Sequence, residues 1–74
     1  MSRQGPKVTY RACISVRVED GWLLFTGIEE GSGLLSEHHV NLANVFDWTS
    51  YDDPDVEDAE IVEVFYSGGG GEPN

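Results

Sequence analysis

The chain has 74 residues and a formal net charge of −10, from fourteen Asp and Glu residues against four Lys and Arg residues. A chain of this length forms one small domain, because only about 60% of the unfolded surface can be buried at this size. The charge excludes direct binding to nucleic acid and to anionic membranes, which depends on Lys and Arg. The single Cys excludes an internal disulfide, and the sequence has no signal-peptide core and no apolar run of membrane-spanning length. We therefore expect a soluble, cytoplasmic protein.

The charges are unevenly distributed along the chain. The basic residues are confined to the first 17 positions, and every acidic residue lies from Glu19 onward. A long segment without Lys or Arg repels itself and attracts cationic partners. Surfaces that serve only solubility usually mix both signs, so this distribution favours a binding role.

The ends of the chain differ in composition from its middle. Residues 1–7 contain Gly5-Pro6 and little to bury, and residues 67–74, SGGGGEPN, form a Gly-rich segment. We expect both ends to be flexible and residues 8–66 to form the single domain. The four glycines do not indicate a phosphate loop, because no Lys or helix follows them.

The clearest periodicity covers Val8 to Val18. In this segment apolar residues alternate with polar ones, which is typical of a half-buried β-strand. The expected inward residues are Val8, Tyr10, Ala12, Ile14, Val16 and Val18, and Cys13 falls on the polar side. Asp20-Gly21 then favours a tight turn, and an apolar run to Ile28 follows, so the sequence predicts an antiparallel hairpin.

The register of this hairpin has two alternatives. A two-residue loop sets Val18 opposite Leu23 and turns Trp22, Leu24 and Ile28 outward. A three-residue loop sets Val18 opposite Trp22 and turns the same three residues inward. In either register the second strand is apolar on both faces, so one face needs a cover or a partner.

Residues 36–46 carry signals for both a helix and a strand. Ser36 is a suitable N-cap, and Leu35 with Val40 has the spacing of a hydrophobic staple. Apolar residues also alternate here, as in a strand. We prefer the helix, and residues 59–66 are rich enough in β-branched and aromatic residues to form a last strand. The predicted fold class is therefore α+β, a small single domain with an antiparallel hairpin, one short helix and a third strand.

No motif indicates catalysis, a metal or a cofactor. His38 and His39 are adjacent, so their side chains diverge and cannot chelate one ion alone. The acidic residues from Asp53 onward lack the Gly and the final Glu of a calcium loop. Cys13 has no companion for redox chemistry. We expect a protein that is not an enzyme, with no cofactor and no metal site.

The acidic segment from Thr49 to Asp58 is the leading candidate for a binding surface. Carboxylates at alternate positions of an extended chain lie on one side, with a separation similar to that of nucleic-acid phosphates. Aromatic residues, which are enriched at binding hot spots, border this segment. The expected partner-binding residues are Asp52, Asp53, Asp55, Glu57, Asp58, Glu60, Glu63, Trp48 and Tyr51. Glu19, Asp20, Glu29 and Glu30 would extend the surface if they lie nearby.

In composition the chain resembles, as a class, the small DNA-mimic inhibitors that phages use against host defence, including anti-CRISPR and anti-restriction proteins. The resemblance covers acidity and size and includes no aligned motif, so no family residues are carried over. It implies an inhibitor that occupies a basic nucleic-acid-binding groove of a host protein. The alternative is an interaction module or a homo-oligomer, such as a homodimer, that uses the apolar hairpin face at Trp22, Leu24 and Ile28.

Overall fold

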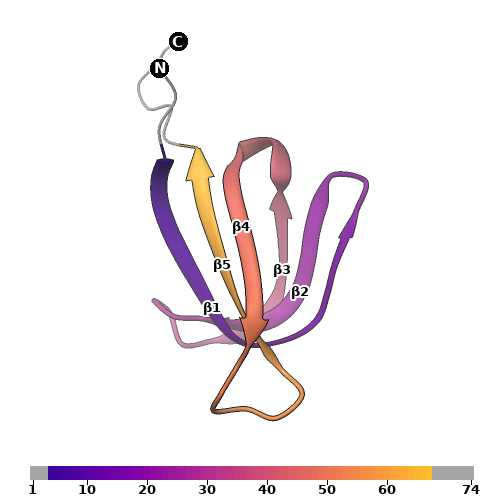
Figure 1. Ribbon diagram of the computed structural model, residues 1–74, viewed down its shortest axis with the longest axis vertical. Helices are drawn as coiled ribbons and strands as arrows, with labels where there is room; N and C mark the ends of the chain where they lie inside the picture. The colour runs from indigo at the N-terminus through magenta and orange to yellow at the C-terminus, as the bar shows by residue number, and fades with distance from the viewer. Residues whose placement is uncertain (1–3, 68–74) are drawn as a thin grey trace.

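The computed structural model describes residues 4–67, which form one five-stranded antiparallel sheet (Figure 1). The strands run in the spatial order β3-β2-β1-β5-β4. Their bounds are β1 (Gln4–Glu19), β2 (Trp22–Glu29), β3 (Leu35–Asn41), β4 (Val45–Asp52) and β5 (Glu60–Ser67), with a 3-10 turn, η1 (Leu42–Asn44), between β3 and β4. Strand β1 thus includes residues 4–7, and the predictions for residues 1–3 and 68–74 lie outside the described residues.

The prediction of an α+β fold with a helix over residues 36–46 is wrong. This segment forms β3, η1 and the start of β4, and β3 pairs with β2 in one unbroken register from Ile28–Leu35 to Trp22–Asn41. Strand alternation prevails because it buries Val40 in the core, whereas Leu35, its expected staple partner, is 64% exposed.

Local hydrogen bonds also oppose a helix in this segment. The side chain of Asn41 accepts a hydrogen bond from the Ala43 backbone N–H at 3.0 Å. Such a bond stabilises a turn and competes with helix propagation. Ser36 does not cap a helix; it lies opposite Gly27 in the sheet, and the chain turns only at η1.

Two β-bulges divide β1. Ala12 and Ser15 have positive φ angles of 54° and 56°, and the pairing of β1 with β2 shifts at both places. Each bulge reverses the side-chain alternation. Cys13 is therefore buried, not on the polar side as predicted, and Ile14 is 50% exposed instead of inward. Of the expected inward set, Tyr10 is in the core, and Val8 and Val16 pack against it.

The β1–β2 hairpin adopts the two-residue register. Val18 pairs with Leu23, and the turn residues Asp20 and Gly21 have φ angles of 51° and 79°. Positive φ at both positions is the signature of the type I′ turn, whose twist matches that of the strands. Leu23 and Phe25 are fully buried.

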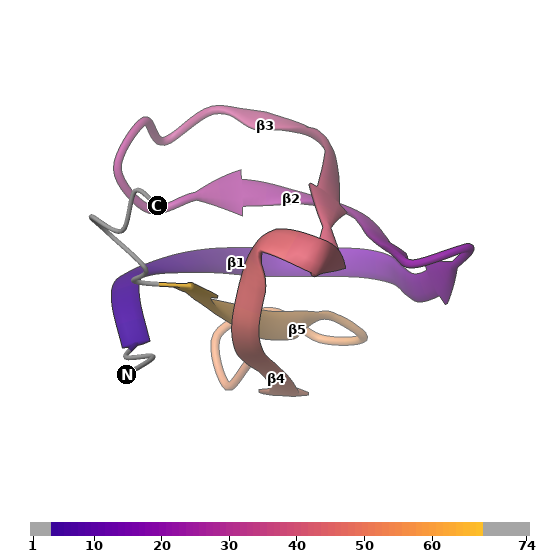
Figure 2. The ribbon, with the colours of Figure 1, turned by 90° about the horizontal axis from the view of Figure 1, so that it is seen from above.

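The core lies on one face of the sheet. Tyr10 is central, with its ring 4.8 Å from the ring of Phe25 and 4.7 Å from that of His38. The buried cluster comprises Tyr10, Cys13, Leu23, Phe25, Val40, Val62 and Val64. Seen from above, β3 and the β4–β5 loop lie on opposite sides of the molecule (Figure 2). No helix within residues 4–67 is long and apolar enough to cross a membrane.

Candidate functional site

Asp53 organises the loop between β4 and β5. Its carboxylate accepts hydrogen bonds from the backbone N–H groups of Asp55 at 2.8 Å and of Ala12 at 3.0 Å, and the residue is 6% exposed. These two hydrogen bonds, that from Asp55 first, hold the pKa of the Asp53 carboxyl below its ordinary value. Asp53 thus ties the loop to the first bulge of β1, and its carboxylate is occupied within the chain.

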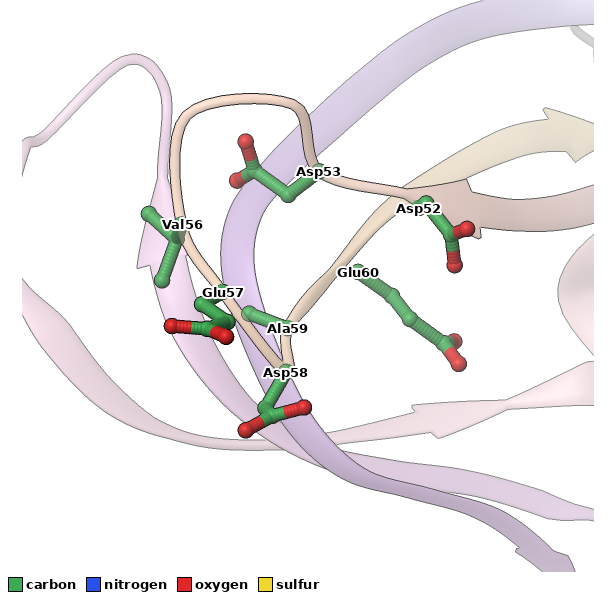
Figure 3. A pocket seen from close by; sticks show the side chains of 7 residues that line it. All are labelled: Asp52, Asp53, Val56, Glu57, Asp58, Ala59 and Glu60. Atoms are coloured by element: carbon green, nitrogen blue, oxygen red, sulfur yellow. The ribbon is translucent and has the colours of Figure 1, made fainter.

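The remaining carboxylates of this segment border an open pocket. The pocket has a volume of about 430 Å³ and is lined by Asp52, Asp53, Val56, Glu57, Asp58, Ala59 and Glu60. Figure 3 shows Asp52 and Glu60 projecting on one side of the loop, while Asp53 turns in another direction, into the loop. Val56 is 39% exposed, so the pocket presents apolar surface together with its carboxylates. We refer to Asp52, Glu57, Asp58 and Glu60 as the acidic pocket residues.

Asp52 and Glu60 are directly opposite each other in the β4–β5 pairing. Side chains in such a position have Cβ atoms about 4.5–5.5 Å apart, and like charges there are destabilising. Within residues 4–67, neither carboxylate forms a salt bridge with Lys, Arg or His. The strand ends therefore hold two uncompensated negative charges at the mouth of the pocket.

The described cations all lie on β1 and are already paired. Lys7 lies 4.0 Å from Glu63, and Arg11 lies 3.0 Å from Asp55. Arg17 contacts Glu19 at 3.5 Å, and its other contact, with Glu37, is at 3.9 Å. These pairs are exposed and contribute little stability. They take up the three cations of residues 4–67, so within those residues no Lys or Arg pairs with the acidic pocket residues.

Trp48 and Tyr51 lie on opposite faces of the sheet. Trp48 is opposite Val64 and packs against the core. Tyr51 is 46% exposed on the outer face, where its hydroxyl donates a hydrogen bond to Glu63 at 2.6 Å. This hydrogen bond raises the pKa of the Tyr51 phenol. The two aromatic residues thus do not border the acidic loop together, and Glu63 lies with Tyr51, away from the pocket.

The other acidic turns lie at the two ends of the molecule. Glu29 and Glu30 are beside the β2–β3 turn, at the same end as the β4–β5 loop, whereas Glu19 and Asp20 are at the β1–β2 turn at the opposite end (Figure 1). Glu29 and Glu30 line a separate hollow beside Lys7, and neither pair lines the acidic pocket. Glu19 and Asp20 are therefore a natural internal control for charge effects.

No metal-binding group is formed within residues 4–67 by three or more His, Cys, Asp or Glu residues. The ring of His38 is packed beside Tyr10 and Phe25, and His39 is exposed beside Glu37. Cys13 is 1% exposed, and burial raises the pKa of its thiol to about 11.

The outer face of β1, β2 and β3 is partly apolar. Ile14, Trp22 and Leu35 are 50%, 41% and 64% exposed. Leu24 and Ile28 lie between them, and both are half-buried. We call these five residues the outer apolar face. It contains all three residues of the alternative interface. Ile14 was not predicted to belong to it, because no residue type marks the bulges that turn its side chain outward.

Comparison with family models, with curated proteins and with solved structures finds no significant match to this chain.

Proposed function

We propose that this protein is a small acidic inhibitor that binds a basic, nucleic-acid-binding groove of a host protein and blocks it by charge competition. The main support is the opposed pair Asp52 and Glu60, which has no cationic partner among residues 4–67. The pair costs stability in the free protein. A cationic partner would relieve the repulsion between Asp52 and Glu60, and this relief would add to the free energy of binding. Binding therefore gives a physical reason for the opposed carboxylates.

The chemistry of the pocket supports a Lys or Arg side chain as the group it accepts. Long basic side chains combine an apolar stem with a charged head. Val56 offers exposed apolar surface to the stem, and the surrounding carboxylates attract the head. A pocket of about 430 Å³ is large enough for one such side chain. Because nucleic-acid-binding grooves are lined by these residues, they are the partner surface we propose.

Binding of this kind is sensitive to salt. We expect the immobilised protein to retain a nucleic-acid-binding protein from nuclease-treated bacterial extract at about 100 mM NaCl and to release it at about 600 mM NaCl, where screening is strong. Added duplex DNA or RNA should displace the same partner. A partner that survives the high-salt wash, or that nucleic acid does not displace, would contradict the proposal.

A pair of matched variants tests the location of the site. Asp52→Asn/Glu60→Gln removes two charges from the pocket, and we expect it to weaken retention about tenfold or more. Glu19→Gln/Asp20→Asn removes the same charge at the other end of the molecule, so retention should change little. Equal losses in both variants would mean that net charge alone governs binding and that the pocket has no special role.

A second candidate function is association through the outer apolar face. The observation that favours it is the exposure of Ile14, Trp22 and Leu35 around two half-buried aliphatic residues. Contiguous exposed apolar surface commonly marks an interaction site. Binding by this face would tolerate high salt, unlike binding by the pocket.

Replacement of Trp22 tests this second candidate. We expect Trp22→Ser to abolish salt-tolerant association, because aromatic side chains dominate binding free energies. Phe46→Ser is a matched control, since Phe46 is 51% exposed on β4 and is not part of the outer apolar face. Loss of association in both variants, or in neither, would exclude a specific role for this face.

A further inference from the structure

The sheet has two edge strands, β3 and β4, and they differ in regularity. The register of β4 shifts between Val45 and Asp47, which marks a bulge near the start of the strand. Strand β3 pairs with β2 at seven consecutive positions without a shift. Strand β3 therefore offers a regular ladder of backbone groups along the whole of its free side, whereas the ladder of β4 is interrupted near its start.

Natural proteins protect their edge strands against pairing with other chains. The usual devices are Pro, Lys, bulges and clustered charge. Strand β4 carries a bulge and acidic residues at Asp47 and Asp52. Strand β3, LSEHHVN, has no Pro, no Lys and no bulge. Figure 2 shows β2 on one side of β3 and no other described strand beyond it. The β3 edge is thus the unprotected edge of the described sheet.

The residues of β3 favour a second copy of the same strand as its partner. In a two-fold antiparallel pair centred on His38, Glu37 of each copy lies opposite His39 of the other. Both residues are exposed, and within one chain His39 Nε2 already lies 3.4 Å from Glu37 Oε2. A two-residue shift would set Glu37 against Glu37 or His39 against His39. Only the His38-centred register sets each Glu37 carboxylate opposite an imidazole of the other copy, which can donate a hydrogen bond to it.

The position of β3 also limits the repulsion between two acidic chains. Strands β2 and β3 carry only Glu29 and Glu37 as acidic residues, and Arg17 contacts Glu37 at 3.9 Å. The acidic pocket residues lie on the opposite side of the molecule from β3 (Figure 2). A dimer formed through β3 would therefore keep the two strongly negative regions apart.

Exposed leucines at the start of β3 add an apolar contribution. Leu34 and Leu35 are 69% and 64% exposed. In the His38-centred register, Leu35 lies opposite Asn41 of the second copy, and Leu34 lies next to Leu42. Covering these side chains removes apolar surface from water, which supports association.

From the regular edge, the facing Glu37 and His39 side chains and the exposed leucines we infer that two copies of this protein pair through their β3 strands to form a continuous ten-stranded sheet. This surface is distinct from the acidic pocket, and it shares Leu35 with the outer apolar face. It goes beyond the proposed function, because a monomer that lost the β3 contact would keep the acidic pocket.

Charge-swap variants test this inference. Sedimentation equilibrium from about 1 to about 200 µM should give a dimer for the unaltered protein and a shift toward monomer on dilution. Glu37→Lys removes the carboxylate that faces His39 of the other copy, and His39→Glu sets a second carboxylate opposite Glu37 of the other copy. Each variant alone should dimerise at least about tenfold more weakly. An equimolar mixture of the two variants should restore dimers, because each then offers the complement of the other.

Two controls separate pairing from folding. Asp47→Lys makes the same charge change on the β4 edge and should leave the dimer intact. Circular dichroism should give each variant the β-sheet spectrum of the unaltered protein. The inference is overturned if the unaltered protein stays monomeric over the whole concentration range. It is also overturned if the mixture of variants fails to restore dimers, or if Asp47→Lys weakens the dimer as much as Glu37→Lys does.

Discussion

The contact between Gly27 and Cys13 leads to a quantitative prediction. A Cβ atom added at Gly27 would lie 2.6 Å from Cys13 Sγ and 3.1 Å from the Arg11 carbonyl oxygen. Non-bonded carbon atoms prefer separations of about 3.5–4.0 Å, so the overlap with sulfur is on the order of 1 Å. Cys13 is 1% exposed and cannot move into solvent. Gly27→Ala therefore forces a displacement of β1 against β2.

The cost of this displacement follows from overpacking in cores. We expect Gly27→Ala to lower the free energy of unfolding by about 2–3 kcal/mol, at the upper end of the range for small-to-large changes. For a domain of this size, each kcal/mol lowers the midpoint of thermal unfolding by roughly 4–8 °C. Thermal and urea unfolding followed by circular dichroism measure the effect. Gly31→Ala is the matched control, because a Cβ there has no neighbour within 4 Å.

A double-mutant cycle identifies the cause. Cys13→Ala removes the sulfur atom, so Cys13→Ala/Gly27→Ala should be more stable than Gly27→Ala alone, with a coupling free energy of about 1 kcal/mol or more. The contact with the Arg11 carbonyl oxygen remains, so rescue should be partial. An unfolding midpoint unchanged in Gly27→Ala, or additive effects in the double variant, would refute this packing of β1 against β2.

Four further predictions concern the charged groups and the thiol. Because the folded-state pKa of Asp53 is lowered, ionisation of its carboxyl group stabilises the protein above the unfolded pKa near 3.8. In urea titrations, the stability advantage of the unaltered protein over Asp53→Asn should therefore shrink as pH falls below that value. An advantage that stays constant would contradict this. Asp52→Asn should raise the unfolding midpoint slightly, because it removes a like-charge pair with Glu60 that destabilises the fold by about 0.2–1 kcal/mol. A lower midpoint would count against the opposed geometry of Asp52 and Glu60. Cys13 should react with a thiol reagent only when the protein unfolds, because the thiol is buried and neutral at pH 7; fast labelling of the folded protein would disprove its burial. Added NaCl should raise the unfolding midpoint by screening carboxylate repulsion, and a falling midpoint would contradict clustered charge.

Local turn chemistry made the first hairpin predictable. Asp20-Gly21 allows positive φ at both turn positions, and the structure has that two-residue turn. The segment 59–66 was also predicted as a strand, and β5 spans Glu60–Ser67. The bulges in β1 could not be predicted, because Ala12 and Ser15 are residue types that rarely adopt positive φ. The sides of Cys13 and Ile14, which lie between the two bulges, were therefore assigned wrongly, whereas Val16 packs against the core as expected.

The failure at residues 36–46 has a different cause. The segment carries helical and alternating periodicities together, and local propensity does not choose between them. Tertiary contacts favour the strand over the helix, because β3 pairs with β2 and the ring of His38 packs against the rings of Tyr10 and Phe25. The acidic loop was evident from composition, but the burial of Asp53 depends on its distant contact with Ala12 N–H. A contact across so many residues has no signature in a single sequence.

The pairing of Gln4 with Ser67 has a consequence for the connectivity of the chain. If residues 67 and 4 were joined by a short linker and the chain were opened at η1, the strands would follow one another as β4-β5-β1-β2-β3, which is their order in the sheet. Every neighbouring pair would then be a local hairpin. In the present connectivity, β1 and β5 must meet from opposite ends of the chain, and such nonlocal pairing slows folding. A circular permutant should therefore keep the same sheet and fold faster.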